Sequence, residues 1–184
     1  VVDDFLRTSN RRIFAAGDVC LEHRYTDTAK ASGHIVVRNA LCFGRARVSA
    51  LTIPWCTYTD PEIAHVGQYV RQARERGIPV KTFTVPMHEV DRAIADGEEN
   101  GFVKVHVREG GDEILGATVV ARHAGEMIND LSLAMVAGIG LGTISQVIHA
   151  YPTQAEAIKK AATAYVRKPA SRWMTWLRRQ WFAR

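Results

Sequence analysis

The chain has 184 residues, of which 47% are hydrophobic and 23% charged, as in an ordinary water-soluble globular protein, and no apolar run reaches the roughly 18 residues of a membrane span. Its length allows one full domain, or one domain with part of another. Eight of the 24 basic residues follow Glu156, and no acidic residue does. Residues 1–156 therefore have 16 basic and 19 acidic side chains. The slightly negative charge of these residues argues against a nucleic-acid partner.

The three cysteines, Cys20, Cys42 and Cys56, are an odd number and lack CxxC spacing. They predict neither a disulfide framework nor a zinc site, and they suit a reducing, cytoplasmic location. The chain has no initiating Met and begins at Val1 in mid-pattern, so we expect it to be a fragment of a longer protein.

The first part of the chain predicts a strand, a turn and a helix. The apolar residues 13–16 are stopped by Gly17-Asp18, which indicates a strand that ends in a tight turn. Apolar side chains then recur at helical spacing over 28–43. We place a domain boundary after residue 47, which divides the chain into residues 1–47, a domain of residues 48–168 and a tail of residues 169–184.

The second part predicts strands followed by helices. Strands are expected at residues 51–58, 81–85, 102–108 and 113–120. In the third of these, valines alternate with Lys104, His106 and Arg108, which predicts one dry and one wet face. Helices are expected at residues 69–76, 124–137 and 153–167, with a short helix or turn at 143–149. Hairpin-length connections followed by helices predict an α+β domain with an antiparallel sheet and helices packed on one face.

Two motifs carry the chemistry. Residues 8–19 read TSNRRIFAAGDV, and residues 148–156, about 130 residues further on, read IHAYPTQAE. In this order they resemble the carboxy-terminal region of the flavin-dependent pyridine nucleotide-disulfide oxidoreductases, the family of glutathione reductase, lipoamide dehydrogenase and mercuric reductase. Residues 54–67 and 113–128 are similar to the entry, the central strand and the following helix of that family's dimerisation domain.

The resemblance implies that residues 1–47 are the end of an FAD-binding domain. Asp18 would accept a hydrogen bond from a ribityl hydroxyl, while Ala16 and Gly17 give the backbone clearance to approach the flavin. The family's GxGxxG and CxxxxC motifs are absent from this chain. The resemblance implies that the complete enzyme uses FAD and NAD(P)H and has a role in cell redox homeostasis. Because the two motifs are absent, we expect neither cofactor to bind tightly to this fragment.

The second motif departs from the family pattern HPTxxE. In the family, the His is the acid-base partner of a thiol across the dimer interface, and the Glu orients it. Here Tyr151 replaces the His, as in mercuric reductase-like members, and Glu156 keeps the five-residue offset. His149 stands two positions early and is not taken as the missing base. The resemblance implies that Tyr151 and Glu156 are catalytic residues contributed to the partner subunit of a homodimer, with a small thiol, disulfide or soft-metal substrate.

Two alternatives for Tyr151 stay open. A phenol with a pKa near 10 is a poor general base at neutral pH, but it can donate a hydrogen bond or act as a phenolate ligand. The other interpretation is a residue that fills a groove at the interface. Mercuric reductases receive metal on paired cysteines at the C-terminus, and their absence here argues against Hg(II) itself. The resemblance also implies a cis Tyr151–Pro152 bond, and an aromatic residue before proline favours the cis isomer further.

Three further expectations complete the picture. We expect the homodimer interface to draw much of its apolar surface from residues 102–107 and 127–135. The histidines have no partners at metal-ligand spacing, so no metal site is predicted. The tail segment 171–184 is basic and rich in tryptophan, and it can either lie on an anionic membrane surface or pack on its own domain or a partner subunit. The rival function is a free-standing, non-catalytic dimerisation module, associated with a membrane surface through that tail.

Overall fold

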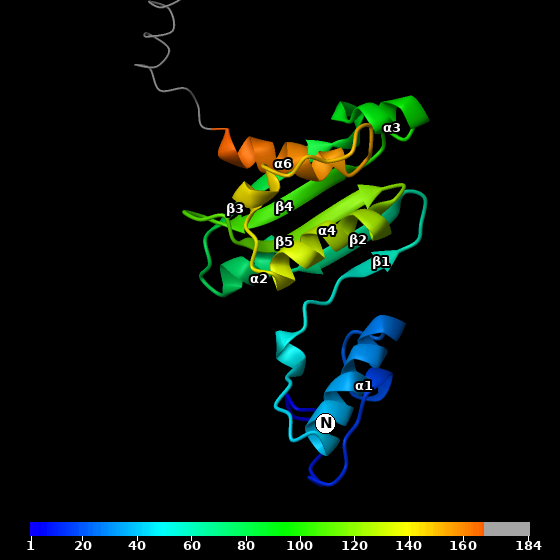
Figure 1. The fold of residues 1–184 in the computed structure, drawn as a ribbon, viewed down its shortest axis with the longest axis vertical. Coiled ribbons are helices and arrows are strands. Elements are labelled where there is room, and N and C mark those ends of the chain that lie inside the picture. Colours follow the sequence, from blue (N-terminus) through cyan, green and yellow to red (C-terminus); the bar gives the residue numbers. More distant parts are fainter. Residues whose placement is uncertain (168–184) are drawn as a thin grey trace, which may run out of the picture. The chain divides into compact units, whose positions relative to one another are not determined.

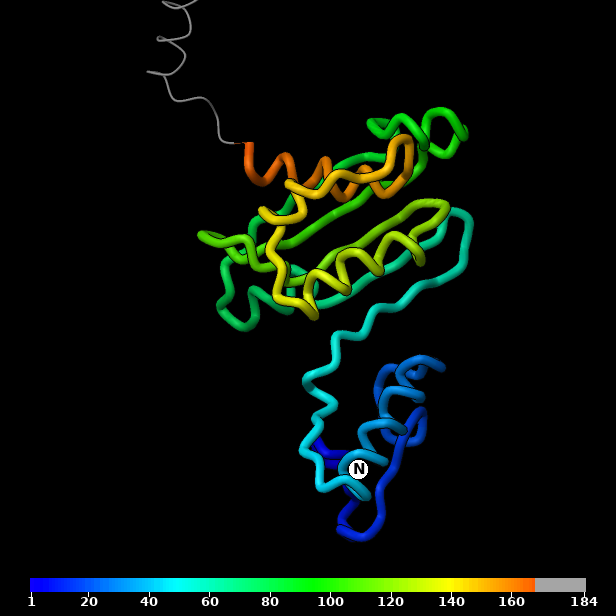
Figure 2. Tube along the Cα trace, in the orientation of Figure 1, coloured from blue at the N-terminus to red at the C-terminus, as the bar shows by residue number. Residues whose placement is uncertain are grey.

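A computed structural model describes residues 1–167 of the chain (Figure 1). The contacts divide the chain into two compact units, one of residues 1–55 and one that begins at Cys56, and each is described by itself (Figure 2). Residues 48–55, which the sequence analysis placed with the second domain, pack with the first unit. The reason is visible at Ser49, whose amide and hydroxyl donate hydrogen bonds of 2.8 and 2.7 Å to the two carboxylate oxygens of Asp4. The tail of residues 169–184 lies outside the described residues.

The first unit contains one long helix, α1 (Thr26–Leu41), and two 3₁₀ turns, η1 (Gly17–Val19) and η2 (Val48–Ala50). The strand predicted at 13–16 is reduced to a single bridge between Arg7 and Phe14. No further strand of the described unit lies beside it to extend the ladder, so the apolar run alone does not make a strand. The helix predicted at 28–43 is confirmed, with both ends shifted by two residues.

The second unit is built on a five-stranded sheet in the order β1-β2-β5-β4-β3. Its strands are β1 (Trp55–Thr57), β2 (Glu62–Gly67), β3 (Val80–Pro86), β4 (Phe102–Arg108) and β5 (Ile114–Ala121). The neighbours β2 and β5, β5 and β4, and β4 and β3 pair antiparallel. The sheet begins with β1 at the end of the linker from the first unit, and β1 is shorter than the strand predicted at 51–58.

Within residues 56–167, the α-helices beside the sheet are α2 (Val70–Glu75), α3 (Asp91–Asp96), α4 (Ala124–Val136), α5 (Leu141–Ile144) and α6 (Glu156–Val166). Figure 1 shows α4 and α6 over the same face of the sheet, where α4 packs on β2 and β5 and α6 packs on β3 and β4. The predicted α+β architecture is thereby confirmed. The sequence analysis missed β2, whose His65 looks polar, and α3, which is too short to show a helical period.

The alternating pattern of β4 was interpreted wrongly on one face. Val103, Val105 and Val107 are fully buried, as predicted, but His106 on the opposite face is also only 4% exposed. On that face His106 stands directly across from Thr82 of β3, and the hydroxyl of Thr82 lies 2.8 Å from Nδ1 of His106. The imidazole is therefore part of the interior.

The predicted source of interface surface is also corrected. The β4 valines are in the core, as are Met127 and Leu131 of α4, which are 4% and 0% exposed. These side chains pack between the sheet and its own helices, so they are not available to a second chain. Within the predicted ranges, Leu133 of α4 is 67% exposed and remains available, and further apolar surface for a partner must come from residues outside them.

A tight approach at Gly101 gives a stability prediction. Its φ is +129°, and an added Cβ would lie 2.0 Å from the carbonyl oxygen of Val120. Gly101→Ala is therefore expected to lower the free energy of unfolding by about 2 kcal/mol, through strain and displacement of β5. Gly111 has open space around its added Cβ, so Gly111→Ala is the matched control and should change stability by less than about 0.5 kcal/mol. Urea denaturation measures both, and equal effects would contradict this account.

Candidate functional site

The predicted catalytic motif lies on the connection between α5 and α6. The hydroxyl of Thr153 donates a 2.8 Å hydrogen bond to the carbonyl of Ala150, which closes a turn just before α6. The Tyr151–Pro152 bond is cis, as predicted. The ring of Tyr151 projects from this turn and is 70% exposed, so it is available to a group outside the described chain.

The phenol of Tyr151 has a partner that sequence reasoning missed. Its O–H donates a 2.7 Å hydrogen bond to Oδ2 of Asp91, the first residue of α3. This bond, and then the charge of Asp91, raise the pKa of Tyr151 above its ordinary value, with smaller contributions from burial and from Glu156. The phenol therefore stays protonated at neutral pH and acts as a hydrogen-bonding group. An acidic residue such as Asp91 is typical of the first turn of a helix, so the sequence can indicate that role. It cannot indicate a hydrogen bond between Asp91 and a residue 60 positions away.

Glu156 is the first residue of α6 and is partly buried. Its Oε1 lies 3.7 Å from Nζ of Lys160, and Lys160 also donates a hydrogen bond to the carbonyl of Glu89. Its Oε2 is buried and has no hydrogen-bond partner among the described residues. The structure thus brings Glu156 close enough to Tyr151 for its charge to raise the phenol pKa, but the hydroxyl itself is held by Asp91.

The predicted flavin-side residues lie in the first unit, apart in the chain from Tyr151 and Glu156. Gly17 is buried with a φ of +74°, and its N–H donates a 2.9 Å hydrogen bond to Oγ of Ser32 on α1. A Cβ at Gly17 would come within 3.3 Å of the Cβ of Ala29, so glycine lets the turn pack on the helix. Ala16 precedes this turn, and the side chain of Asp18 is exposed.

These residues fit the flavin contact that the resemblance implies. Asp18 offers an exposed carboxylate as an acceptor, and α1 begins without a side-chain cap, which leaves its first amides as donors. The hydroxyl of Thr28, in the first turn of α1, is buried and has no partner among the described residues. No GxGxxG is present in the sequence to cradle a diphosphate. Residues 16–18 would therefore supply one side of a flavin site.

Two buried histidines lie on the second face of the sheet. His65 approaches the hydroxyl of Thr118 at 2.9 Å, and its ring stacks on Tyr69 with centroids 3.8 Å apart. Burial lowers the pKa of His65, and burial with the charges of Lys104 and His65 lowers the pKa of His106 to about 4. Both imidazoles are neutral at pH 7 and satisfy interior hydrogen bonds.

Residues 1–167 contain neither a metal-binding cluster nor a membrane-spanning helix. In this range no group of three or more His, Cys, Asp or Glu side chains is arranged to hold a metal ion. Over the same residues, no helix has the length and apolar character to cross a membrane. The three cysteines are free thiols.

The second unit is an α+β domain with an antiparallel sheet. The loop before α6 presents Tyr151, whose hydroxyl is bound by Asp91 at the start of α3. Residues 53–162 match the model of the pyridine nucleotide-disulphide oxidoreductase dimerisation domain. Mercuric reductase from Staphylococcus aureus is 35% identical over 165 residues, which are 90% of this chain and 30% of that protein. Dihydrolipoyl dehydrogenase from Chlamydia muridarum is 32% identical over 167 residues, which are 91% of this chain and 36% of that protein.

Solved structures agree with the sequence comparison. LpdA from Mycobacterium tuberculosis matches with a TM-score of 0.83 and 28% identity, over 91% of this chain and 36% of that one. The HOCl-induced flavoprotein disulfide reductase RclA from Escherichia coli matches with a TM-score of 0.81 and 27% identity, over 91% of this chain and 38% of that one. The chain belongs to the pyridine nucleotide-disulphide oxidoreductase family and contains its dimerisation domain. It spans about a third of the length of these relatives.

Proposed function

We propose that the chain is the carboxy-terminal, dimer-forming part of an FAD- and NAD(P)H-dependent oxidoreductase of a reducing cytoplasm, of the mercuric reductase-like type. The observation that carries the proposal is the exposed Tyr151 phenol held by Asp91 at 2.7 Å, in the position where most members of the family have a histidine. The 35% identity to a mercuric reductase supports the subtype. The substrate class is a small thiol, a disulfide or a soft metal ion.

FAD, when bound, supplies the two-electron relay between a nicotinamide and a cysteine pair. The residues of this chain handle protons and position the reacting group. Because the pKa of Tyr151 is raised, its phenol is neutral and can donate a hydrogen bond. When a thiolate is near, the phenol can donate that hydrogen bond to the thiolate instead of to Asp91. The charge of Glu156 acts in the same direction, since it also favours the protonated phenol.

We propose that the homodimer interface uses exposed apolar side chains of residues 133–151. The large exposed hydrophobic residues of this stretch are Leu133, Val136, Ile139, Val147, Ile148 and Tyr151, and Ile148 is 89% exposed. Exposed apolar residues concentrated in one stretch are typical of an interaction surface. An interface there would also place Tyr151 at the boundary with the partner subunit.

This interface gives a prediction about assembly. The chain should be a dimer at micromolar concentration in size-exclusion chromatography with light scattering. Ile148→Asp should shift it to a monomer, because a buried unpaired carboxylate is strongly unfavourable at an apolar interface. Ile13→Asp is the control, since Ile13 is also exposed but belongs to the first unit. A wild-type monomer, or equal effects of the two substitutions, would count against the proposed interface.

The catalytic part of the proposal is tested in a full-length enzyme that contains this chain. Purified enzyme is reduced with NADPH or NADH, and reoxidation of the flavin is followed with a mercuric thiolate, lipoamide and glutathione disulfide. Reoxidation by at least one of these substrates is expected. If the reading frame upstream of Val1 encodes neither GxGxxG nor CxxxxC, the free-standing dimerisation module replaces this proposal.

A further inference from the structure

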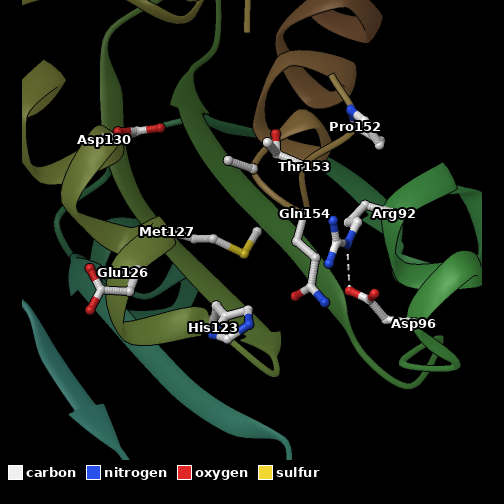
Figure 3. A pocket seen from close by; sticks show the side chains of 10 residues that line it. Arg92, Asp96, His123, Glu126, Met127, Asp130, Pro152, Thr153 and Gln154 are labelled. Carbon is white, nitrogen blue, oxygen red and sulfur yellow. Dashed lines mark hydrogen bonds and ion pairs between the residues drawn. The ribbon is translucent and has the colours of Figure 1, made fainter. Parts of the chain in front are cut away.

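A hollow of about 360 Å³ lies between α3, the first turns of α4 and the loop before α6 (Figure 3). Its charged and polar lining residues are Arg92, Asp96, His123, Glu126, Asp130, Thr153 and Gln154. Met127, Pro152 and Ala155 add an apolar wall. The volume is within the range of small-ligand sites.

Gln154 is the unusual member of this lining. It is only 5% exposed, and both its amide nitrogen and its amide oxygen are buried without a hydrogen-bond partner among the described residues. In Figure 3 its side chain extends from the loop toward the space between His123 and the Arg92–Asp96 pair. Buried polar groups in proteins nearly always have partners, so an amide with neither its donor nor its acceptor used indicates that the hollow receives a partner group.

The chemistry of Gln154 restricts that group. A carboxylate would satisfy only the amide nitrogen, and an ammonium would satisfy only the amide oxygen. A second amide satisfies both, because its carbonyl accepts from the nitrogen of Gln154 while its N–H donates to the oxygen. Of these three groups the amide alone pairs with both atoms of Gln154, and a peptide unit supplies it.

The charges of the lining restrict the rest of the ligand. Arg92 is paired with Asp96, with Nε and Oδ2 2.7 Å apart, and this bond lowers the pKa of Asp96 so that it stays ionised. Glu126 and Asp130 form no ion pair within residues 1–167 and leave the hollow with an excess of negative charge. A ligand with an anionic group is disfavoured there, and a neutral or cationic one is favoured.

We propose that this hollow is a binding subsite for an amide-bearing ligand of neutral or positive charge, in which Gln154 makes a pair of hydrogen bonds to the ligand amide. The apolar wall of Met127, Pro152 and Ala155 would contact an aliphatic stem. All the lining residues belong to the second unit of one chain, so the inference does not depend on the proposed redox function.

Access to Gln154 requires a small rearrangement of the rim. The side chain of Arg92 is 49% exposed, and its pairing with Asp96 spans one helical turn. Exposed pairs of this kind are weak, so Arg92 can turn aside when a ligand enters. His123 is exposed and can move in the same way. Side-chain adjustments of this size are common when ligands bind.

The test uses the whole chain and two model ligands. N-acetyl-lysine N-methylamide carries two amides and a cation, whereas N-acetyl-aspartate N-methylamide carries two amides and an anion. In a ¹⁵N-resolved NMR titration, the lysine compound should shift the side-chain amide signals of Gln154, and the aspartate compound should bind at least about tenfold more weakly. No binding of either, or a preference for the aspartate compound, overturns the proposal.

Two sets of variants complete the test. Gln154→Leu should weaken binding of the lysine compound at least about tenfold, while Gln146→Leu, at an exposed position, should leave it unchanged. Thermal unfolding shows whether Gln154→Leu remains folded. The double variant Glu126→Gln, Asp130→Asn changes only surface residues. It should reduce the ratio of the affinities for the lysine and aspartate compounds. Unchanged binding by Gln154→Leu, or an unchanged preference in the double variant, overturns the proposed subsite. An ordered water would then be the hydrogen-bond partner of the Gln154 amide.

Discussion

Tyr151→Phe is expected to slow reoxidation of the reduced full-length enzyme by its thiol, disulfide or soft-metal substrate by about ten- to a hundredfold. The substitution removes one hydroxyl, and a hydrogen bond to a charged group is worth about 1.5–3 kcal/mol when it acts in the transition state. Reduction of the flavin by NAD(P)H should be unchanged, because the proposed function assigns Tyr151 to the side of the site that faces the cysteine pair. Stopped-flow absorbance separates the two half-reactions.

Asp91→Asn is the matched variant for this prediction. It keeps an oxygen that can accept the hydrogen bond of Tyr151 but removes the charge, so the phenol pKa should fall toward its ordinary value. An ultraviolet titration of the phenolate measures that change. If Tyr151→Phe leaves the oxidative half-reaction unchanged with every substrate tried, Tyr151 is a packing residue and the catalytic assignment is wrong.

Mild acid is expected to destabilise the second unit through His106. Its pKa in the folded chain is about 4, below the ordinary value of 6.5, because the imidazole is buried beside Lys104 and His65. Between pH 6.5 and 4, His106 therefore binds a proton in the unfolded chain but not in the folded chain. The stability contribution is complete above pH 6.5 and is lost as the pH falls toward 4. Linkage gives a loss of about 2 kcal/mol between pH 7.5 and pH 5.

Urea denaturation at these two pH values measures the effect. His106→Gln removes the titrating group and should flatten the pH dependence, although its stability at pH 7.5 can differ from that of the wild type. His123→Gln, at an exposed position, is the control for the exchange of a histidine for a glutamine. His65 adds to the acid loss, since its pKa is also lowered by burial. A wild-type stability that is flat from pH 7.5 to pH 5 would contradict the neutral, buried state of His106.

Much of the second unit could be predicted from the sequence. The bounds of β4 are those predicted, and α4 differs from its prediction by one residue at one end. Both segments have strong local signals, namely alternation of valines in β4 and a four-residue spacing of apolar side chains in α4. The order of the two motifs also identified the family, which the match of residues 53–162 confirms.

Local signals failed where burial or pairing depends on distant residues. The local pattern predicts an exposed His106, but in the sheet it stands across from Thr82 of β3, which contacts its ring, and its side chain is only 4% exposed. The strand predicted at 13–16 has the right composition, yet the described first unit gives it only one bridge. β2 was missed because His65 looks polar until Thr118 and Tyr69 are placed against it.

The candidate site divides in the same way. The sequence by itself was enough to predict Tyr151, Glu156 and residues 16–18 as the candidate site residues, because that prediction rests on local motifs. Only the tertiary structure decided that Asp91 holds the phenol and that the amide of Gln154 is enclosed without a partner. Asp91 and Tyr151 are 60 positions apart, and the hollow around Gln154 is made by α3, α4 and the loop before α6 together. Hydrogen bonds and burial depend on distance in space, which no periodicity along the chain records.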